Sequence, residues 1–254
     1  MGPSNSMSEH PRRVLLAPGY ILHHRPYRDT SRILEVLARD HGRLTLFARG
    51  VRGPKPRFAG VLQPFELLLL SFQLGREAGQ LTGAESAESV SPLPSASFMP
   101  GFYLNELLLK LTTRHDPVPE VFADYRRALA GLRAGGRIEA VLRVFEKRLL
   151  EAVGYGLDLT SEARTGKAIE AEGFYRFRAS HGLVPGRKGD ADAVAGSSLL
   201  ALAREELGEE GRALEDARRV MKAALAERLE GKELSTRKVA LSVVSRRGGS
   251  RTSH

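Results

Sequence analysis

The sequence predicts an α+β protein in which a closed barrel of five strands precedes a mainly α-helical domain. Two observations lead to this fold class. Over about the first ninety residues, short apolar segments are separated by Gly, Pro, Asp and Arg, which is the pattern of strands joined by turns. From Pro100 onwards the apolar residues recur with a period of about 3.6, the period of an α-helix. We therefore expect one domain over 12–92 and a second over 97–244.

Five segments of the first domain have the composition of strands, and several of them alternate between apolar and polar residues. They are residues 14–24, 32–38, 43–51, 65–72 and 80–90. No long helical segment separates them. Because the OB-fold is a common way to close five strands into a small barrel, we expect the first domain to be an OB-fold.

Helices are expected through most of the second domain. The expected helices are 102–114, 118–135, 137–153, 198–207, 212–229 and 235–244. Short connections join the first three, which is typical of a helix bundle. Residues 157–195 form an irregular insert that is rich in Gly and charge and has one strand candidate at 174–177. The largely polar ends, 1–11 and 245–254, are expected to be disordered.

The chain is strongly basic. It has 39 Lys and Arg residues against 30 Asp and Glu residues, a formal net charge of +9 and a calculated pI near 10.1. This balance favours a polyanionic partner, with nucleic acid first and an anionic membrane surface second. An Arg-rich codon usage would raise the net charge in the same way. The position of the cations in the sequence therefore has to distinguish a binding surface from a general excess of Arg.

Composition also excludes several classes of function. The chain has no Cys, which excludes disulfides, thiolate catalysis and Cys-ligated metal sites. No apolar stretch reaches the length of a membrane span, and the N-terminus lacks the apolar core of a signal peptide. We therefore expect a cytoplasmic protein with no membrane partner.

No motif of the sequence has the residues that catalysis requires. Gly166 and Lys167 do not end a phosphate-binding loop, because the first Gly and the final hydroxyl residue of that motif are missing. The Ser-x-x-Lys match at 235–238 lacks the companion motifs of acyl-serine enzymes and is interpreted as a helix cap. His23 and His24 are adjacent on an expected strand, so they point to opposite faces and cannot share a metal. We expect no catalytic residue, no metal site and no cofactor.

The main functional signal is a basic segment on the third expected strand and in the loop after it, GRLTLFARGVRGPKPRF. By alternation, one face of the strand carries Leu44, Leu46 and Ala48, and the other carries Arg43, Thr45, Phe47 and Arg49. The loop adds Arg52, Lys55 and Arg57. Residues 42–63 contain no acidic residue, so the second face and the loop form a basic surface around one aromatic ring.

Cations with an aromatic ring are what single-stranded DNA binding requires, because the cations neutralise phosphates while the ring stacks on a base. We therefore predict that DNA contacts Arg43, Phe47, Arg49, Arg52, Lys55 and Arg57. Two alternatives remain at this point. The charges could form a solvated strand face, and the ring of Phe47 could be buried by the following domain.

Several separate blocks of the chain resemble the RecO family of DNA repair proteins in order and spacing. These blocks are GYILHHRPYRDTSRILEVLARDHGRLTLFARGVRGPK, LQPFELLLLSF, FYLNELLLKL, FEKRLLEAVGYGLDL and GKELSTRKV. The resemblance covers about residues 12–244. It implies an OB-fold, a helical C-terminal domain and a nucleoid-associated role in the RecF recombination pathway of a bacterium. Members of this family bind single- and double-stranded DNA, anneal complementary strands and, with RecR, help RecA load onto DNA coated by the single-stranded DNA-binding protein, SSB.

The resemblance also implies which residues act. The family's DNA-binding basic stretch falls on Arg43, Arg49, Arg52, Lys55 and Arg57. Its anchor for the acidic, apolar C-terminal tail of SSB falls on Arg143, for which the alternative is a solvent-exposed helix charge. Charge alone adds the helical neighbours Lys110, Arg126 and Arg127. Many family members carry a zinc site of four cysteines after the sequence GYG, which is 154–156 in this chain. This chain has none of those cysteines, so it is expected to be a zinc-free version.

Two other functions remain as alternatives to a non-enzymatic mediator. One is a metal-dependent DNA-processing enzyme with dispersed carboxylates. The acidic residues of 205–210 are interpreted as a solvated face and not as its catalytic pair. The other is a protein adaptor with only secondary DNA binding.

Overall fold

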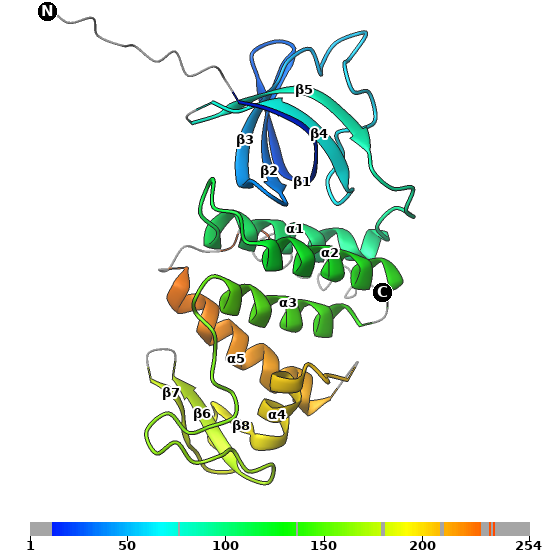
Figure 1. Ribbon diagram of the computed structural model, residues 1–254. Helices are drawn as coiled ribbons and strands as arrows, with labels where there is room; N and C mark the ends of the chain where they lie inside the picture. Colours follow the sequence, from blue (N-terminus) through cyan, green and yellow to red (C-terminus); the bar gives the residue numbers. More distant parts are fainter. Residues whose placement is uncertain are drawn as a thin grey trace, which may run out of the picture. The chain divides into compact units, whose positions relative to one another are not determined.

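The computed structural model describes residues 12–75, 77–135, 137–178, 181–208, 211–229, 234 and 236. The chain divides into two compact units. One consists of Met1–Ser91 and Thr113–Pro119, and the other of Pro92–Thr112 and Glu120–His254. In Figure 1 the first unit contains the blue and cyan strands, and the second contains most of the green helices and the yellow and orange elements. The fold class is therefore α+β, as predicted.

The first unit is built on a closed barrel of five strands, as the sequence predicts (Figure 1). The strands are β1 (Arg13–Tyr27), β2 (Ser31–Ala38), β3 (Gly42–Ala48), β4 (Leu68–Gln73) and β5 (Gly79–Ser86). Their order round the barrel is β1-β2-β3-β5-β4, and pairing of β1 with β4 closes it. Only β3 and β5 pair in parallel among these neighbours. This five-stranded barrel is the OB-fold that the sequence predicts.

Several strand boundaries differ from the predicted ones. β3 ends at Ala48 and β5 at Ser86, before the predicted ends at residues 51 and 90. β1 continues beyond residue 24 to Tyr27, because His24 to Tyr27 pair residue by residue with the first residues of β2. β4 begins at Leu68 and not at residue 65. The reason is that Phe65 has a φ of 69°, which is incompatible with an extended strand.

The interior of the barrel follows the predicted alternation. Leu44, Leu46 and Ala48 of β3 are buried in the core. Leu44 lies in register with Val36 of β2, and Leu46 with Leu34. On the other face of β3, Thr45 is paired with Glu35 and Phe47 with Ile33. Because side chains alternate between the two faces of a strand, this register fixes which charges point away from the core.

The second unit is mainly helical. Its helices are α1 (Ser95–Leu111), α2 (Pro119–Ala134), α3 (Ile138–Ala152), α4 (Gly196–Arg204) and α5 (Arg212–Arg228). α1 begins before the predicted start at residue 102, because Pro100 lies inside the helix and does not end it. Thr112 ends α1 in an extended conformation, with its hydroxyl donating to the carbonyl of Leu108 at 2.7 Å. Leu214, Met221, Leu225 and Leu229 are buried, as the helical spacing predicts.

The expected irregular insert contains a small antiparallel sheet. Its strands are β6 (Phe174–Arg178), β7 (Gly182–Pro185) and β8 (Ala193–Ala195), in the order β7-β6-β8. Tyr175 is buried at its centre, and its hydroxyl accepts the backbone N–H of Glu170 at 3.0 Å. The carboxylate of Asp216 on α5 accepts the N–H of Ala195 at 3.0 Å and the hydroxyl of Ser198 at 2.8 Å. Packing and hydrogen bonds therefore hold this region together.

Three predictions fall on parts of the chain outside the described residues. They are the end segments 1–11 and 245–254 and almost all of the helix at 235–244. Within the described ranges, no helix has both the length and the apolar character needed to cross a membrane.

Candidate nucleic-acid interface

The first residue of the predicted DNA-binding face, Arg43, is not an exposed cation. Its side chain is only 13% exposed, and its Nη1 lies 3.4 Å from Oε2 of Glu35 on the neighbouring strand. Arg114 Nη2 and the Thr45 hydroxyl both contact the other oxygen of Glu35, each at 2.9 Å. Burial lowers the pKa of Arg43, while the Glu35 carboxylate opposes this shift. Arg43 is therefore part of an ion-paired cluster.

The segment Thr113–Pro119 explains why this end of β3 is crowded. The His115 N–H donates to the carbonyl of Arg43 at 3.0 Å, so the segment lies against the start of the strand. A Cβ at Gly42 would lie 2.3 Å from the Asp116 carbonyl oxygen, and Gly42 has a φ of 65°. Only Gly satisfies both conditions, because other residues rarely adopt this backbone conformation and any side chain would clash.

The remaining predicted cations lie in the loop that follows β3. Arg49, Arg52, Lys55 and Arg57 are all exposed. None of these four has an ion-pair partner among the residues that the structure describes. Arg57 donates to the Thr82 carbonyl at 3.2 Å, and its guanidinium lies 5.0 Å from the ring centroid of Phe58. Neither the carbonyl nor the ring carries a negative charge, so the positive charge of Arg57 is not neutralised.

The loop is tied to the turn between β1 and β2. The carbonyl of Thr30 accepts the N–H of Val51 at 2.9 Å and the N–H of Arg52 at 3.0 Å. Arg52 Nη1 also lies 3.4 Å from the carbonyl of Arg28. Two segments that are separated in sequence are therefore held side by side.

This turn brings three residues to the interface that the sequence analysis did not select. Arg25, Tyr27 and Arg28 are exposed at the end of the β1–β2 hairpin. The guanidinium of Arg28 lies 5.2 Å from the centroid of the Tyr27 ring, and that ring lies 5.2 Å from the ring of Phe47. The run RPYR has the same mixture of cations and an aromatic residue as the segment on β3, and this similarity is the signal that could have identified it.

The combined surface of hairpin and loop is basic. It carries the exposed cations Arg25, Arg28, Arg49, Arg52, Lys55 and Arg57. Asp29 is the one acidic residue in 12–34, and 41–65 contain none. A surface with this excess of unpaired cations attracts phosphates at long range and binds them at contact. We call it the hairpin–loop surface.

The helical unit places Arg143 differently from its prediction. The alternative of a solvent-exposed helix charge is wrong, because the side chain is only 9% exposed. Its Nη2 lies 2.8 Å from Oε1 of the fully buried Glu146, which also accepts the Tyr103 hydroxyl at 2.5 Å. Burial raises the pKa of Glu146 to about 7, although Arg143 opposes the shift. Arg143 Nε and Glu146 Oε2 have no hydrogen-bond partner among the described residues.

Two of the three helical neighbours predicted to assist Arg143 pair with carboxylates on their own helices. Lys110 lies 3.4 Å from Glu106 on its own helix. Arg126 is exposed on α2, and Arg127 forms an ion pair with Asp124 of the same helix.

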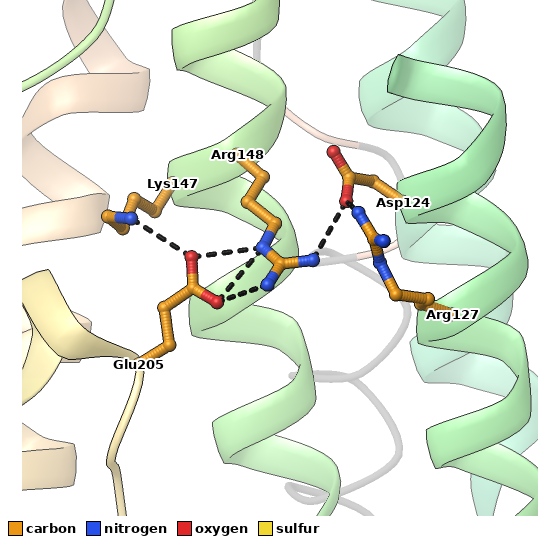
Figure 2. A network of polar contacts seen from close by, with 5 residues as sticks. All are labelled: Asp124, Arg127, Lys147, Arg148 and Glu205. Carbon is orange, nitrogen blue, oxygen red and sulfur yellow. Dashed lines mark hydrogen bonds and ion pairs between the residues drawn. The ribbon is translucent and has the colours of Figure 1, made fainter. Parts of the chain in front are cut away.

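Figure 2 shows the ion-pair network to which Arg127 belongs. Arg148 on α3 lies at its centre: Nη1 is 2.9 Å from Asp124 Oδ1, and Nε is 2.9 Å from Glu205 Oε1. Lys147 adds a second cation 3.0 Å from Glu205. Hydrogen bonding to Glu205 raises the pKa of Arg148, and the same bond lowers the pKa of Glu205. Glu205 is therefore an ion-pair partner at the end of α4, in contrast to the solvated face that the sequence indicates.

A cavity of about 360 Å³ lies between α2 and α3 next to this network. Small apolar residues form most of its wall, and Arg127, Arg137 and Arg148 line it together with Asp124 and Glu205. The two carboxylates already pair with Arg127 and Arg148. Among the described residues, no group of three or more His, Cys, Asp or Glu could hold a metal ion.

Comparison with known proteins agrees with this division of the chain. The family model described as "Recombination protein O N terminal" matches residues 13–90, and the model described as "Recombination protein O C terminal" matches residues 98–237. The chain belongs to the RecO family. The hairpin–loop surface lies in the part that the first RecO model matches, and the cavity and Arg143 lie in the part that the second matches.

Similar proteins are found over most of the chain. "DNA repair protein RecO" of Methylococcus capsulatus is 44% identical over 239 residues, which cover 94% of this chain and 98% of that protein. The protein of the same name from Nitrosococcus oceani is 40% identical and covers 89% of this chain. That of Alkalilimnicola ehrlichii is 43% identical, also over 89% of this chain. Membership of the RecO family therefore applies to both units.

Proposed function

We propose that the chain is a non-enzymatic DNA-binding mediator of recombinational repair. In this role it binds single- and double-stranded DNA and anneals complementary strands. The observation that carries the proposal is the hairpin–loop surface, where six exposed cations from two separate segments accompany one acidic residue. Membership of the RecO family supports the same function.

Phosphate binding follows directly from this arrangement. Each cation that contacts a phosphate releases counterions from the DNA, so affinity falls as salt rises. If four to six of these cations engage one strand, log K falls against log salt with a slope of roughly −3 to −4. The four loop cations are proposed to contact phosphates and not base edges, so binding is expected to be independent of the DNA sequence.

Annealing requires the same surface to accept a second strand. Cations that screen the phosphates of both strands lower the repulsion between them while base pairs form. This step uses no nucleotide and breaks no covalent bond. The proposal therefore needs no catalytic residue, and a cleavage assay with divalent metal ions is expected to leave DNA intact.

The helical unit is proposed to recruit partners. The acidic, apolar C-terminal tail of SSB is expected to bind there through Arg143, and RecR is expected to act with the chain so that RecA can load onto coated DNA. A tail that ends in carboxylates suits a guanidinium, and binding through Arg143 requires that its side chain, which is 9% exposed and paired with Glu146, becomes accessible. The chain would act in the cytoplasm, in association with the nucleoid.

Annealing of oligonucleotides with and without SSB tests the two roles separately. The charge reversal Arg49→Glu, Arg52→Glu and Arg57→Glu is expected to abolish annealing of both bare and coated strands. Arg143→Ala is expected to slow annealing of coated strands only. Because Arg143 is buried, the unfolding free energy of the Arg143→Ala variant is measured in parallel, and the exposed substitution Lys222→Ala serves as the control. A wild-type chain that neither binds nor anneals DNA would overturn the proposal.

A further inference from the structure

The exposed ring at the hairpin–loop surface belongs to Tyr27. Tyr27 ends β1 and keeps 36% of its surface exposed, whereas Phe47 on β3 is half-buried. The two ring centroids are 5.2 Å apart and the ring planes are tilted by 52°. Phe47 therefore lies against one part of the Tyr27 ring and leaves another part open to solvent.

Neighbouring contacts order the Tyr27 ring and the turn that carries it. The guanidinium of the adjacent Arg28 lies 5.2 Å from the centroid of this ring, and Arg28 has a φ of 52°, in the left-handed region. The hydrogen bonds from Val51 and Arg52 to Thr30 fasten the same turn to the loop. A ring that is already ordered loses little conformational entropy when a base stacks on it.

We propose that Tyr27 is the base-stacking residue of this interface and that it strengthens binding of single-stranded DNA but not of duplex DNA. Phe47, to which the sequence analysis assigned this role, supports the Tyr27 ring. The inference rests on the proposed DNA-binding function and deepens it. The exposed cations Arg28 and Arg52 lie on the same turn and loop, where they reach the phosphates that flank a stacked base.

The physical reason for this difference is the availability of base faces. In a single strand a base can leave its neighbours and stack on an aromatic ring whatever its identity. In a duplex each base already stacks on the next pair, so the ring gains nothing without unstacking the helix. The cations, in contrast, contact the phosphates of either form. Tyr27 therefore adds affinity for one form only.

Affinity measurements with two DNA forms test this assignment. Tyr27→Ala is expected to weaken binding of single-stranded oligothymidylate roughly tenfold, while duplex affinity and the slope of log K against log salt stay unchanged. Tyr27→Phe keeps the ring and is expected to bind as the wild type does. The matched control is Tyr155→Ala, which removes an exposed ring beside Arg228 in the helical unit, where the guanidinium lies 4.2 Å from the centroid.

A spectroscopic readout tests stacking directly. The chain contains no Trp, so Tyr27→Trp introduces a single fluorophore at the proposed site, and Tyr155→Trp introduces one at the control site. Oligothymidylate is expected to quench the first and leave the second unchanged. Wild-type affinity in Tyr27→Ala, or absence of quenching while Tyr27→Trp binds DNA, overturns the stacking role and leaves the DNA-binding function intact. Failure of the wild type to bind DNA overturns both.

Discussion

Arg49 and Lys55 of the hairpin–loop surface and Arg143 and Arg148 of the helical unit have opposite surroundings. Arg49 and Lys55 of the barrel are exposed, and neither has an ion-pair partner among the described residues. In the helical unit, Arg143 pairs with buried Glu146, and Arg148 pairs with Asp124 and Glu205 (Figure 2). Net charge alone therefore does not identify a DNA-binding surface. What matters is which cations the fold leaves without a carboxylate.

The largest expected effect comes from reversing three unpaired cations of the barrel. Arg49→Glu, Arg52→Glu and Arg57→Glu together are expected to lower affinity for single-stranded DNA by about a thousandfold at low salt, since three phosphate contacts are lost and repulsion is added. Fluorescence anisotropy with a labelled oligonucleotide measures this loss. An affinity within a few-fold of the wild type would show that the DNA path lies elsewhere.

A second effect concerns the buried carboxyl of the helical unit. In the folded chain Glu146 keeps its proton up to about pH 7, whereas a Glu in the unfolded chain releases it near its ordinary pKa of 4.5. The folded state therefore binds more protons between these values, and the unfolding free energy falls as pH rises through this window. Over the whole window the loss is about 3 kcal/mol.

Urea denaturation at several pH values measures this effect. Glu146→Gln cannot ionise, so its unfolding free energy is expected to depend less steeply on pH between about 4.5 and 7 than that of the wild type. Parallel pH profiles for the two proteins would contradict the assignment. DNA affinity, which depends on the other unit, serves as the control and is expected to be the same in both.

A third and smaller effect tests whether the paired cations serve stability. Arg148→Ala leaves Asp124 paired with Arg127 and Glu205 paired with Lys147. It is expected to lower the unfolding free energy by about 2 kcal/mol, which is less than the loss expected from breaking a fully buried ion pair. Lys222→Ala, an exposed cation on α5, is the matched control and is expected to change little. Equal stability of the two variants would show that the network in Figure 2 contributes nothing measurable.

The sequence predicts the parts of this molecule that depend on local period. Alternation on β3 predicts the buried positions Leu44 and Leu46, and helical spacing predicts those of α5. The same alternation cannot predict that Arg43 is paired, because its partner Glu35 lies on another strand and Arg114 lies far along the chain. Ion pairs between elements depend on strand register and packing, and the sequence pattern of one strand does not determine either.

The candidate site shows the same limit. The loop cations follow from a run without acidic residues, and the structure leaves Arg49, Arg52 and Arg57 exposed. Tyr27 was missed because the predicted strand stops before it. Its neighbour Phe47 lies on a different strand, so the ring pair exists only once the barrel is closed.

The barrel contains a matched pair of cations on and just after β3. Arg43 and Arg49 lie six positions apart in the sequence, and they differ in that Arg43 is paired with Glu35 while Arg49 is exposed. The measurement is the slope of log K against log salt for single-stranded DNA in Arg43→Gln and Arg49→Gln. We predict that Arg49→Gln makes the slope shallower by about 0.7 and that Arg43→Gln leaves it unchanged. A shallower slope for Arg43→Gln, or an unchanged slope for Arg49→Gln, would contradict the account.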